Sequence, residues 1–272
     1  GPETITTTFG QAFYFLPHDL RRALVFTVRP DRYLRLRARR LSVPGDGYSF
    51  QGFDTRRCIF VHIPKAAGVS INRTLFGNLG GGHRSMRDYQ LIFSRRDFER
   101  YFKFTFVRNP WDRLLSAYNF LKRGGMTKDD RLWAEANLAA YDDFEQFVTG
   151  WVTRSNLSLY VHFKPQVDFL RTPHSDRLPI DFLGFYENLS ADFRYVCRRL
   201  GLPGNIELTQ ENRTAVGAGA PDYRSRYTDE MREIVAEAYR EDIVTFGYAF
   251  DDSSPDALLA RCPDGHMARW DD

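Results

Sequence analysis

A loop in the first quarter of the chain has residue types suited to binding an anion. An apolar run that ends at Ile63 leads into residues 64–70, Pro-Lys-Ala-Ala-Gly-Val-Ser, and a helical pattern follows. Small side chains let backbone N–H groups approach an anion closely, and the dipole of the following helix favours negative charge. We therefore predict that a phosphate-like group is bound here by Lys65, Ala66, Ala67, Gly68, Val69 and Ser70.

The position of the lysine separates this loop from the common nucleoside triphosphate loop. That loop has the pattern G-x-x-x-x-G-K-[ST], with the lysine next to a hydroxyl residue that helps to hold Mg²⁺. Here Val69 precedes Ser70, and Lys65 comes three residues before Gly68. A nucleoside triphosphate with its metal is therefore a poor fit. An ordinary strand–helix turn is the alternative for this segment taken alone.

A second set of polar residues follows another apolar run, in the segment FTFVRNPWDRLLSAY (104–118). Arg108 lies at the carboxyl end of the run, where open parallel sheets bind ligands. Pro110 is suited to the first turn of a helix, and Ser116 lies eight residues beyond Arg108. An arginine fork and a serine hydroxyl predict a second, separate phosphate site.

These residues need a sheet and its helices to position them. Short apolar runs alternate with longer helical patterns, which predicts an α/β fold with a parallel sheet and helices on both faces. The predicted strands are Cys58–Ile63, Tyr101–Val107 and Phe182–Phe185. The predicted helices are Val69–Phe76, Pro110–Arg123, Phe144–Thr149, Ser155–His162, Leu189–Leu200 and Asp229–Phe246.

Composition excludes several classes of protein. The 272 residues are 43% hydrophobic and 15% aromatic, which indicates a globular chain and not a disordered one. No window approaches the roughly 18 apolar residues of a membrane span, and no signal peptide is recognisable. The three cysteines, Cys58, Cys197 and Cys262, share no metal-ligand spacing. Their odd number favours a reducing compartment over a disulfide framework.

Charge is distributed unevenly. The net charge is +3, but residues 19–40 contain eight arginines against Asp19 and Asp31, a local net charge of +6. The rest of the chain has 30 basic and 33 acidic residues. Such asymmetry is typical of a protein with an anionic partner. The alternatives are a solvated helical face and a packing or dimer surface.

Taken together, the loop and the Arg108 segment resemble the sulfotransferases that use 3′-phosphoadenosine 5′-phosphosulfate (PAPS). The form HIPKAAGVS is similar to the branch that contains the Golgi carbohydrate sulfotransferases and bacterial relatives. Three later segments agree. HFKPQVDFL (162–170) resembles the F-x-P-Q motif of that branch, DFLGFYENL (181–189) resembles its late strand, and residues 212–250 resemble its cofactor-covering loop and last helix.

The resemblance covers about residues 56–251 and implies a domain organisation. It implies an α/β sulfotransferase fold, a P-loop-like parallel sheet flanked by helices, as a single domain at 56–251. An N-terminal extension with the Arg-rich segment (1–55) would precede this domain, and a C-terminal tail (252–272) would follow it.

The resemblance also implies an activity. A sulfuryl group would pass in line from PAPS to an acceptor hydroxyl, with a glycan as the expected acceptor, PAP as the product and no metal required. The loop would bind the 5′-phosphosulfate, and Lys65 would neutralise charge on the leaving phosphate. Arg108 and Ser116 would bind the 3′-phosphate. Arg213 and Tyr223, in the late loop, are expected to contact the 3′-phosphate or the adenine.

An acceptor hydroxyl needs a general base, and histidine is the natural choice near neutral pH. His83 follows a glycine turn in GGHRSMRDY, at the place where the resemblance puts the base, and we expect it to be catalytic. A plain surface role is the alternative. His62 is expected to be structural. His162, Lys164 and Gln166 flank the Pro-Gln motif, where they either line the acceptor side or are structural.

Two other functions compete with this interpretation. A P-loop nucleotide kinase would need Mg²⁺ and the lysine that is missing before Ser70. A non-catalytic module would hold an anionic polymer or a membrane through the Arg-rich segment, with binding that falls steeply with salt. We expect no nucleic-acid partner and leave homo-oligomerisation open. The expected location is the cytoplasm. The alternative, the Golgi lumen, requires a membrane anchor ahead of Gly1.

Overall fold

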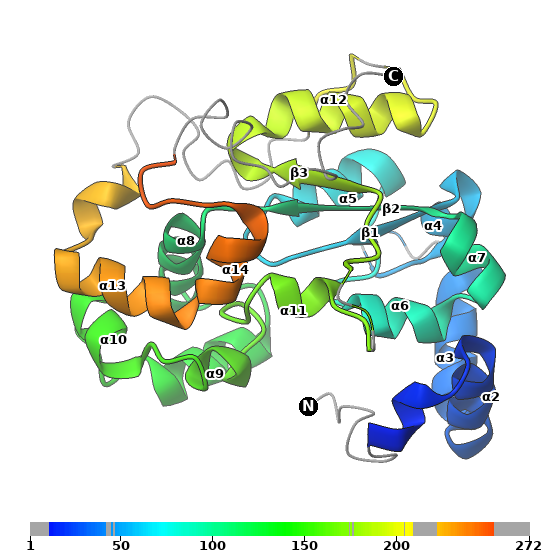
Figure 1. Cartoon of the computed structure of the whole chain (residues 1–272), viewed down its shortest axis with the longest axis horizontal. Helices are drawn as coiled ribbons and strands as arrows, with labels where there is room; N and C mark the ends of the chain where they lie inside the picture. Colours follow the sequence, from blue (N-terminus) through cyan, green and yellow to red (C-terminus); the bar gives the residue numbers. More distant parts are fainter. Residues whose placement is uncertain are drawn as a thin grey trace. The chain divides into compact units, whose positions relative to one another are not determined.

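The computed structural model describes residues 11–41, 45, 47–173, 175, 177–203, 205–208 and 222–252 (Figure 1). The strands are β1 (Cys58–Val61), β2 (Phe102–Val107) and β3 (Phe182–Phe185). The first α-helices are α2 (His18–Val28), α3 (Pro30–Leu41), α4 (Gln51–Arg56), α5 (Gly68–Phe76), α6 (Met86–Ile92), α7 (Arg95–Arg100) and α8 (Pro110–Lys122). The later ones are α9 (Lys128–Asn137), α10 (Phe144–Trp151), α11 (Val167–Leu170), α12 (Leu189–Arg199), α13 (Asp229–Ala238) and α14 (Arg240–Phe246). Four short 3₁₀ turns are η1 (Gln11–Phe15), η2 (Asn156–Leu159), η3 (Tyr186–Asn188) and η4 (Tyr223–Arg226).

The three strands form one sheet in the order β1-β2-β3. Strands β1 and β2 are parallel, with Cys58 opposite Phe102 and Val61 opposite Thr105. All residues of β1 and β3 are buried, which is typical of strands covered on both faces. Helix α4 packs against β1 and α12 against β3. The predicted α/β class is confirmed, and each predicted strand is found to within two residues.

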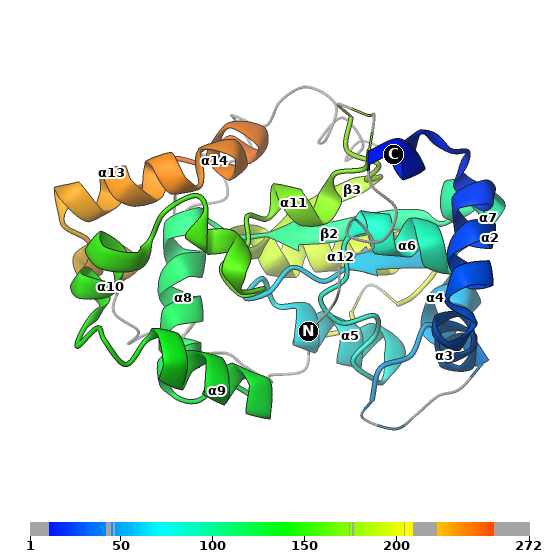
Figure 2. The ribbon, with the colours of Figure 1, turned by 90° about the horizontal axis from the view of Figure 1, so that it is seen from below.

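By internal packing the chain divides into two compact units. Unit 1 contains Gly1–His62, Ile71–Thr105 and Asp168–Asp181, and unit 2 contains Ile63–Ser70, Phe106–Val167 and Phe182–Asp272. Aromatic side chains fill the core of unit 2, where the rings of Phe147 and Trp151 lie 5.1 Å apart. Figure 2 shows α10 and α13 side by side in this unit.

The Arg-rich segment forms α2 and α3 of unit 1, and Figure 2 shows α2 beside α6. Arg22 donates from Nε to a backbone carbonyl of α6 at 3.1 Å, and Arg32 lies 3.8 Å from Asp88. Arg40 forms two hydrogen bonds with Asp54, at 2.8 and 2.7 Å. These arginines therefore hold α2 and α3 against the rest of unit 1. This supports the interpretation of the Arg-rich segment as a packing surface for these arginines. Among the described residues no helix has the length and apolar character needed to cross a membrane.

One predicted helix is wrong. Over Ser155–His162 the structure has only the 3₁₀ turn η2. The amide of Asn156 donates to the carbonyl of Trp151 at 2.8 Å, and its backbone N–H binds the Thr153 hydroxyl. These local side-chain bonds compete with helical hydrogen bonds and end α10 instead of starting a new helix.

A second predicted helix is divided. The pattern of Asp229–Phe246 predicts one helix, but the chain breaks at Tyr239 between α13 and α14. The Tyr239 side chain is buried and its hydroxyl donates to the carbonyl of Phe163 at 2.6 Å. Asp242, at the start of α14, accepts backbone N–H bonds from Gln166 and Val167. Tertiary contacts thus set the direction of α14.

Helices α6, α7 and α9 were not predicted, although each begins with a clear signal. Ser85, Ser94 and Thr127 precede them, and each side chain accepts a hydrogen bond from the backbone N–H of an aspartate three residues later. A serine or threonine cap followed by an acidic residue is a recognised helix start.

Gly184 in β3 provides a test of the packing in unit 2. A Cβ at this position would lie 2.5 Å from the ring of Phe106, which is fully buried. We expect Gly184→Ala to lower the free energy of unfolding by about 1–3 kcal/mol because the ring must shift. Urea unfolding measures this, and Gly45→Ala is the control, since a Cβ there meets no atom within 4 Å. Equal midpoints for the two variants would contradict the packing.

Candidate active site

The chain leaves β1 and enters a strained turn before α5 begins at Gly68. Lys65 has a φ of 69° and Ala67 a φ of 63°, in the left-handed region that favours glycine. Left-handed residues alternating with others are the backbone pattern of anion-binding nests. Such strain persists only where the surroundings enforce it and clusters at functional sites. The geometry thus favours an anion site over an ordinary turn.

Two arginines that flank the start of α8 hold the carbonyl groups of this turn. Buried Arg113 donates to the carbonyl of Pro64 at 3.4 Å, and Arg108 Nη1 donates to the carbonyl of Lys65 at 3.1 Å. In a planar trans peptide the C=O and the following N–H point in opposite directions. The N–H groups of Lys65 and Ala66 therefore point away from these guanidinium groups and are directed toward the nest.

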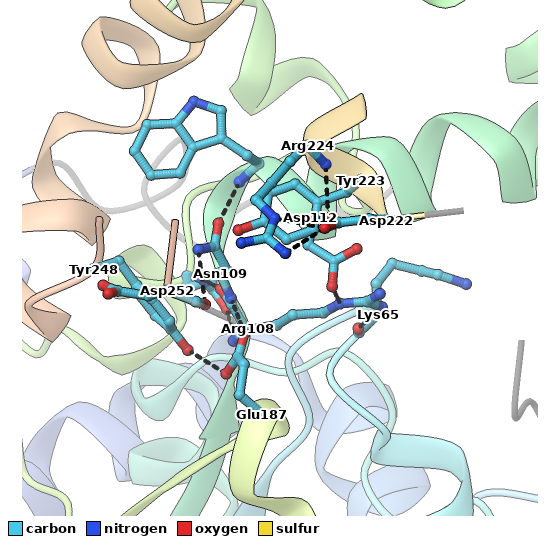
Figure 3. Close-up of polar contacts among 12 residues, drawn as sticks. Lys65, Arg108, Asn109, Asp112, Glu187, Asp222, Tyr223, Arg224, Tyr248 and Asp252 are labelled. Carbon is cyan, nitrogen blue, oxygen red and sulfur yellow. Dashed lines mark hydrogen bonds and ion pairs between the residues drawn. The ribbon is translucent and has the colours of Figure 1, made fainter. Parts of the chain in front are cut away.

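Arg108 lies directly after β2, as predicted, and its side chain has a fixed orientation (Figure 3). Its Nε donates to Asp112 Oδ2 at 2.8 Å, and its guanidinium carbon lies 4.1 Å from the ring centre of Tyr186. The side-chain amide of Gln166 binds both the backbone N–H and the carbonyl of Arg108, at 2.9 and 2.8 Å. Burial opposes the charge of Arg108, but the neighbouring Asp112 keeps its pKa above the usual value. Gln166 is thus a structural amide.

Lys65 carries a poorly solvated positive charge. Its Nζ lies 4.1 Å from the ring centre of Phe120, and the ammonium group forms no hydrogen bond or ion pair among the described residues. Burial, together with the charges of Arg108 and Arg123, lowers the pKa of this lysine to about 8 against an opposing effect of Asp130. A bound anion would raise this pKa. The ammonium group is therefore charged at neutral pH but lacks a carboxylate in direct contact.

Glu187 is the second acidic group near Arg108 (Figure 3). It accepts hydrogen bonds from the backbone N–H of Asn109 at 2.6 Å and from the Tyr248 hydroxyl at 3.0 Å. Burial raises the pKa of Glu187 to about 7, so near neutral pH this group is only partly ionised. The positive charge of Lys65 and Arg108 is thus incompletely compensated by the protein.

The other predicted contacts of the anion are placed as follows. Ser70 is buried in the first turn of α5, and Ser116 is half-buried on α8, with no hydrogen bond from its hydroxyl among the described residues. The hydroxyl of Tyr223 donates to the carbonyl of Phe250, inside the core of unit 2. Arg213 lies outside the described residues. The structure thus brings Lys65 and Arg108 together and shows no contact of Ser116 or Tyr223 with either.

The candidate base His83 belongs to unit 1. Its Nδ1 lies 3.3 Å from the carbonyl oxygen of His62, and the two rings are 4.3 Å apart. Because a carbonyl only accepts, Nδ1 carries a proton in this contact, and in the neutral ring Nε2 is then the basic nitrogen. His62 is buried and lies 3.4 Å from the Asn72 amide, as expected of a structural residue.

His162 is buried in unit 2 and lies 3.2 Å from Asp130, whose carboxylate also accepts the Tyr160 hydroxyl at 2.6 Å. Its carbonyl is one of the acceptors of Arg113. These contacts make His162 part of the framework around the site. Within the described ranges no three His, Cys, Asp or Glu side chains converge as metal ligands.

Sequence reasoning missed four residues of the site: Asp112, Arg113, Phe120 and Tyr186. Only Asp112 had a readable signal, since residues four apart face each other on a helix and it follows Arg108 by four. The other three gain their roles from contacts with residues distant in the sequence.

Comparison with known proteins identifies the family of this chain. The sequence model of the Sulfotransferase family matches residues 50–249, more than half of the chain. Carbohydrate sulfotransferase 11 of Rattus norvegicus is 23% identical over 85% of this chain and 76% of its own length. Carbohydrate sulfotransferase 14 of Danio rerio is 24% identical over 58% of this chain and 49% of its own length.

An uncharacterized protein of Archaeoglobus fulgidus is 30% identical over 41% of this chain and 77% of its own length. No solved structure matches the chain. The strained loop, the oriented Arg108 and the extent of the family match lead to one conclusion: this chain belongs to the sulfotransferase family.

Proposed function

We propose that this sulfotransferase takes its sulfuryl group from PAPS and transfers it to a hydroxyl of a carbohydrate. The observation that carries the proposal is the pairing of two cationic groups in unit 2, the nest with Lys65 and the oriented Arg108. A nucleotide with phosphates at both the 5′ and the 3′ positions can use both groups. The carbohydrate acceptor is supported by the names of two relatives.

The residues present fit such a nucleotide. The N–H groups of the nest, Lys65 and Ser70 would hold the 5′-phosphosulfate. Arg108 uses Nε and Nη1 within the protein, but its Nη2 forms no hydrogen bond among the described residues. This nitrogen and the Ser116 hydroxyl would hold the 3′-phosphate. ATP has no 3′-phosphate, and membership of the sulfotransferase family also decides against the nucleotide kinase.

The same residues can stabilise the transfer. PAPS supplies a sulfuryl group bonded to a nucleotide phosphate, which is the leaving group. Lys65 and the N–H groups of the nest face the negative charge that develops on this phosphate, and they do so without reorganisation because Arg113 and Arg108 already fix the turn. Since the Lys65 ammonium group forms no ion pair with a carboxylate of the described residues, its charge can act on the leaving phosphate. No metal is needed in this scheme.

His83 is the proposed general base. With Nδ1 bonded to the carbonyl of His62, the lone pair on Nε2 can accept the proton of the acceptor hydroxyl. The neighbouring His62 carbonyl would also stabilise the imidazolium that forms. This role is supported by the tautomer that the hydrogen bond imposes.

PAP binding tests the donor. With EDTA present, we expect PAP to raise the melting temperature more than ADP does, because only PAP has a 3′-phosphate. Arg108→Ala should weaken PAP binding about tenfold to a hundredfold, the effect of losing a charge-assisted hydrogen bond of about 1.5–3 kcal/mol. Ser116→Ala should have a smaller effect, and Arg131→Ala, on the exposed side of α9, serves as control. Equal stabilisation by PAP and ADP, or a requirement for Mg²⁺, would contradict the proposal.

The pH dependence of Lys65 acetylation tests the role of this residue without an assay of transfer activity. Competitive acetylation followed by mass spectrometry should show half-maximal reactivity of Lys65 near pH 8. Saturating PAP should move this midpoint upward by at least about one pH unit, since a nearby negative charge favours the ammonium form. In the unliganded protein the pKa of this lysine is below its usual value of 10.5, so its contribution to stability grows as pH rises from about 8 to 10.5. An unchanged pH midpoint of acetylation with PAP bound would argue against contact between Lys65 and PAP.

His83→Ala tests the base. The variant should keep the PAP-induced rise in melting temperature but lose at least about a hundredfold in kcat, the usual contribution of general base catalysis. His18→Ala is the matched control in the same unit, since the His18 imidazole contacts the backbone carbonyl of Phe93 and the ring of Phe98. Near-normal turnover of His83→Ala would remove this residue from the mechanism.

A further inference from the structure

Most of the positive charge of the chain belongs to one unit. By sequence, unit 1 has 19 basic and 11 acidic residues, a net charge of +8, whereas unit 2 has 19 basic and 24 acidic residues, a net charge of −5. The proposed sulfuryl donor site uses cations of unit 2. The excess charge of unit 1 therefore remains unexplained by the transfer reaction.

A hollow of about 370 Å³ on unit 1 gathers part of this charge. Its lining residues are Arg57, Arg96, Asp97, Arg100 and Tyr101. Arg57 directly precedes β1, and Arg96 and Arg100 are four residues apart on one face of α7. All three arginines are exposed, and none of their side chains forms a hydrogen bond or ion pair within the described part of the chain.

The two carboxylates beside the hollow, Asp54 and Asp97, share one guanidinium partner, that of Arg40. Asp54 accepts two hydrogen bonds from Arg40 and one from the Tyr101 hydroxyl, the last at 2.8 Å. Asp97 lies 3.6 Å from the same Arg40 guanidinium. Arg40 offsets one of these two carboxylates, so the three arginines of the hollow still outnumber the remaining carboxylate, and none of the three forms an ion pair among the described residues. Like charges in such proximity repel, and a ligand with several negative charges would relieve this repulsion.

The backbone that carries the arginines is fixed. Arg57 has a φ of 50° at the end of α4, its N–H donates to the Asp54 carbonyl, and its own carbonyl accepts the N–H of Phe102 at 2.9 Å. Helix α7 begins with the Ser94 side chain accepting the N–H of Asp97 at 3.1 Å. The three arginines thus project from fixed backbone positions, which lowers the backbone part of the entropic cost of binding.

We propose that this hollow, formed by Arg57, Arg96 and Arg100, binds an acidic polysaccharide through its carboxylate or sulfate groups. The planar guanidinium fork matches both groups with paired hydrogen bonds. Anion binding follows from the unpaired charge alone, whereas the choice of a carbohydrate rests on the proposed function. The hollow would hold a polymeric acceptor at the start of β1, separate from the loop that follows the end of this strand.

Two other polyanionic partners fit the lining less well. Binding at a lipid surface uses apolar side chains that enter the bilayer, and the lining has none. Binding of single-stranded nucleic acid uses aromatic rings as stacking platforms. The only ring in the lining is that of Tyr101, which packs 5.5 Å from Phe93 and donates its hydroxyl to Asp54.

Binding of labelled heparin and polygalacturonate, in the absence of any nucleotide, tests the proposal. The triple variant Arg57→Gln, Arg96→Gln, Arg100→Gln should lose at least about tenfold in affinity near 50 mM salt, and its log Kd should depend less steeply on log salt. The matched control removes three exposed arginines of α9 and α12, Arg131→Gln, Arg194→Gln and Arg198→Gln, and should bind within about twofold of the original chain. Replacing the first three arginines by lysine should restore only part of the affinity, because the ammonium group keeps the charge but lacks the paired hydrogen bonds.

Neutral dextran, phosphatidylserine vesicles and single-stranded DNA are the comparison probes. The proposal is overturned if both triple variants lose affinity equally, which would mean a general charge effect. It is also overturned if the original chain binds neither polysaccharide, or if vesicles or DNA bind more tightly through the same arginines. The PAP melting shift, measured on the same variants, reports separately on the proposed function and should be unchanged by the loss of the three arginines.

Discussion

The loop after β1 depends on one buried guanidinium group. Arg113 donates to four backbone carbonyls, those of Pro64, His162, Phe163 and Lys164, at 3.4, 3.3, 3.4 and 2.6 Å. Its hydrogen-bond partners within the described residues include no carboxylate, and the ring of Tyr239 lies 5.5 Å from its guanidinium carbon. Loss of this side chain would leave buried carbonyl groups without a partner, at about 1–3 kcal/mol for each. Arg113 therefore joins the anion loop to the segment before α11.

This anchoring explains how two non-glycine residues stay in the left-handed region. Each such residue costs about 1–3 kcal/mol, and the cost must be met by surrounding contacts. The hydrogen bonds of Arg113 and Arg108 with the Pro64 and Lys65 carbonyls offset this cost. The result is a turn whose N–H groups and lysine are in place before a ligand arrives. The depressed pKa of Lys65 belongs to the same arrangement, because burial and the neighbouring arginine charges outweigh the effect of Asp130.

The parts that could be predicted from the sequence are those set by neighbouring residues. The strands are continuous apolar runs, the loop is marked by small residues after Pro64, and Arg108 directly follows a strand. The missed parts depend on distant contacts. A charged residue inside a helix is expected to face solvent, so the buried position of Arg113 has no local signal. The same holds for the break at Tyr239, which is set by a carbonyl remote in the sequence.

Counting charged residues along the sequence does not show which of them are paired within the folded protein. The density of arginine in residues 19–40 indicated an anionic partner, but Arg32 and Arg40 bind Asp88 and Asp54 of the protein itself. An excess of charge is informative only after the internal ion pairs have been identified. The unpaired arginines of unit 1 are Arg57 and two residues of α7. They are distant in the sequence, so a short window of the sequence does not contain all of them.

The cations of the two proposed sites differ in exposure, and this difference has a physical consequence. Lys65 and Arg108 are shielded from solvent, so mobile ions screen their charge only weakly, whereas Arg57, Arg96 and Arg100 are exposed and fully subject to screening over a Debye length of about 8–10 Å. A small nucleotide held by buried, oriented groups should therefore keep most of its affinity as salt increases. A polymer held at the exposed arginines should be released and recaptured readily. If both proposals hold, the difference in burial alone would give tight retention of the nucleotide and reversible capture of the polymer.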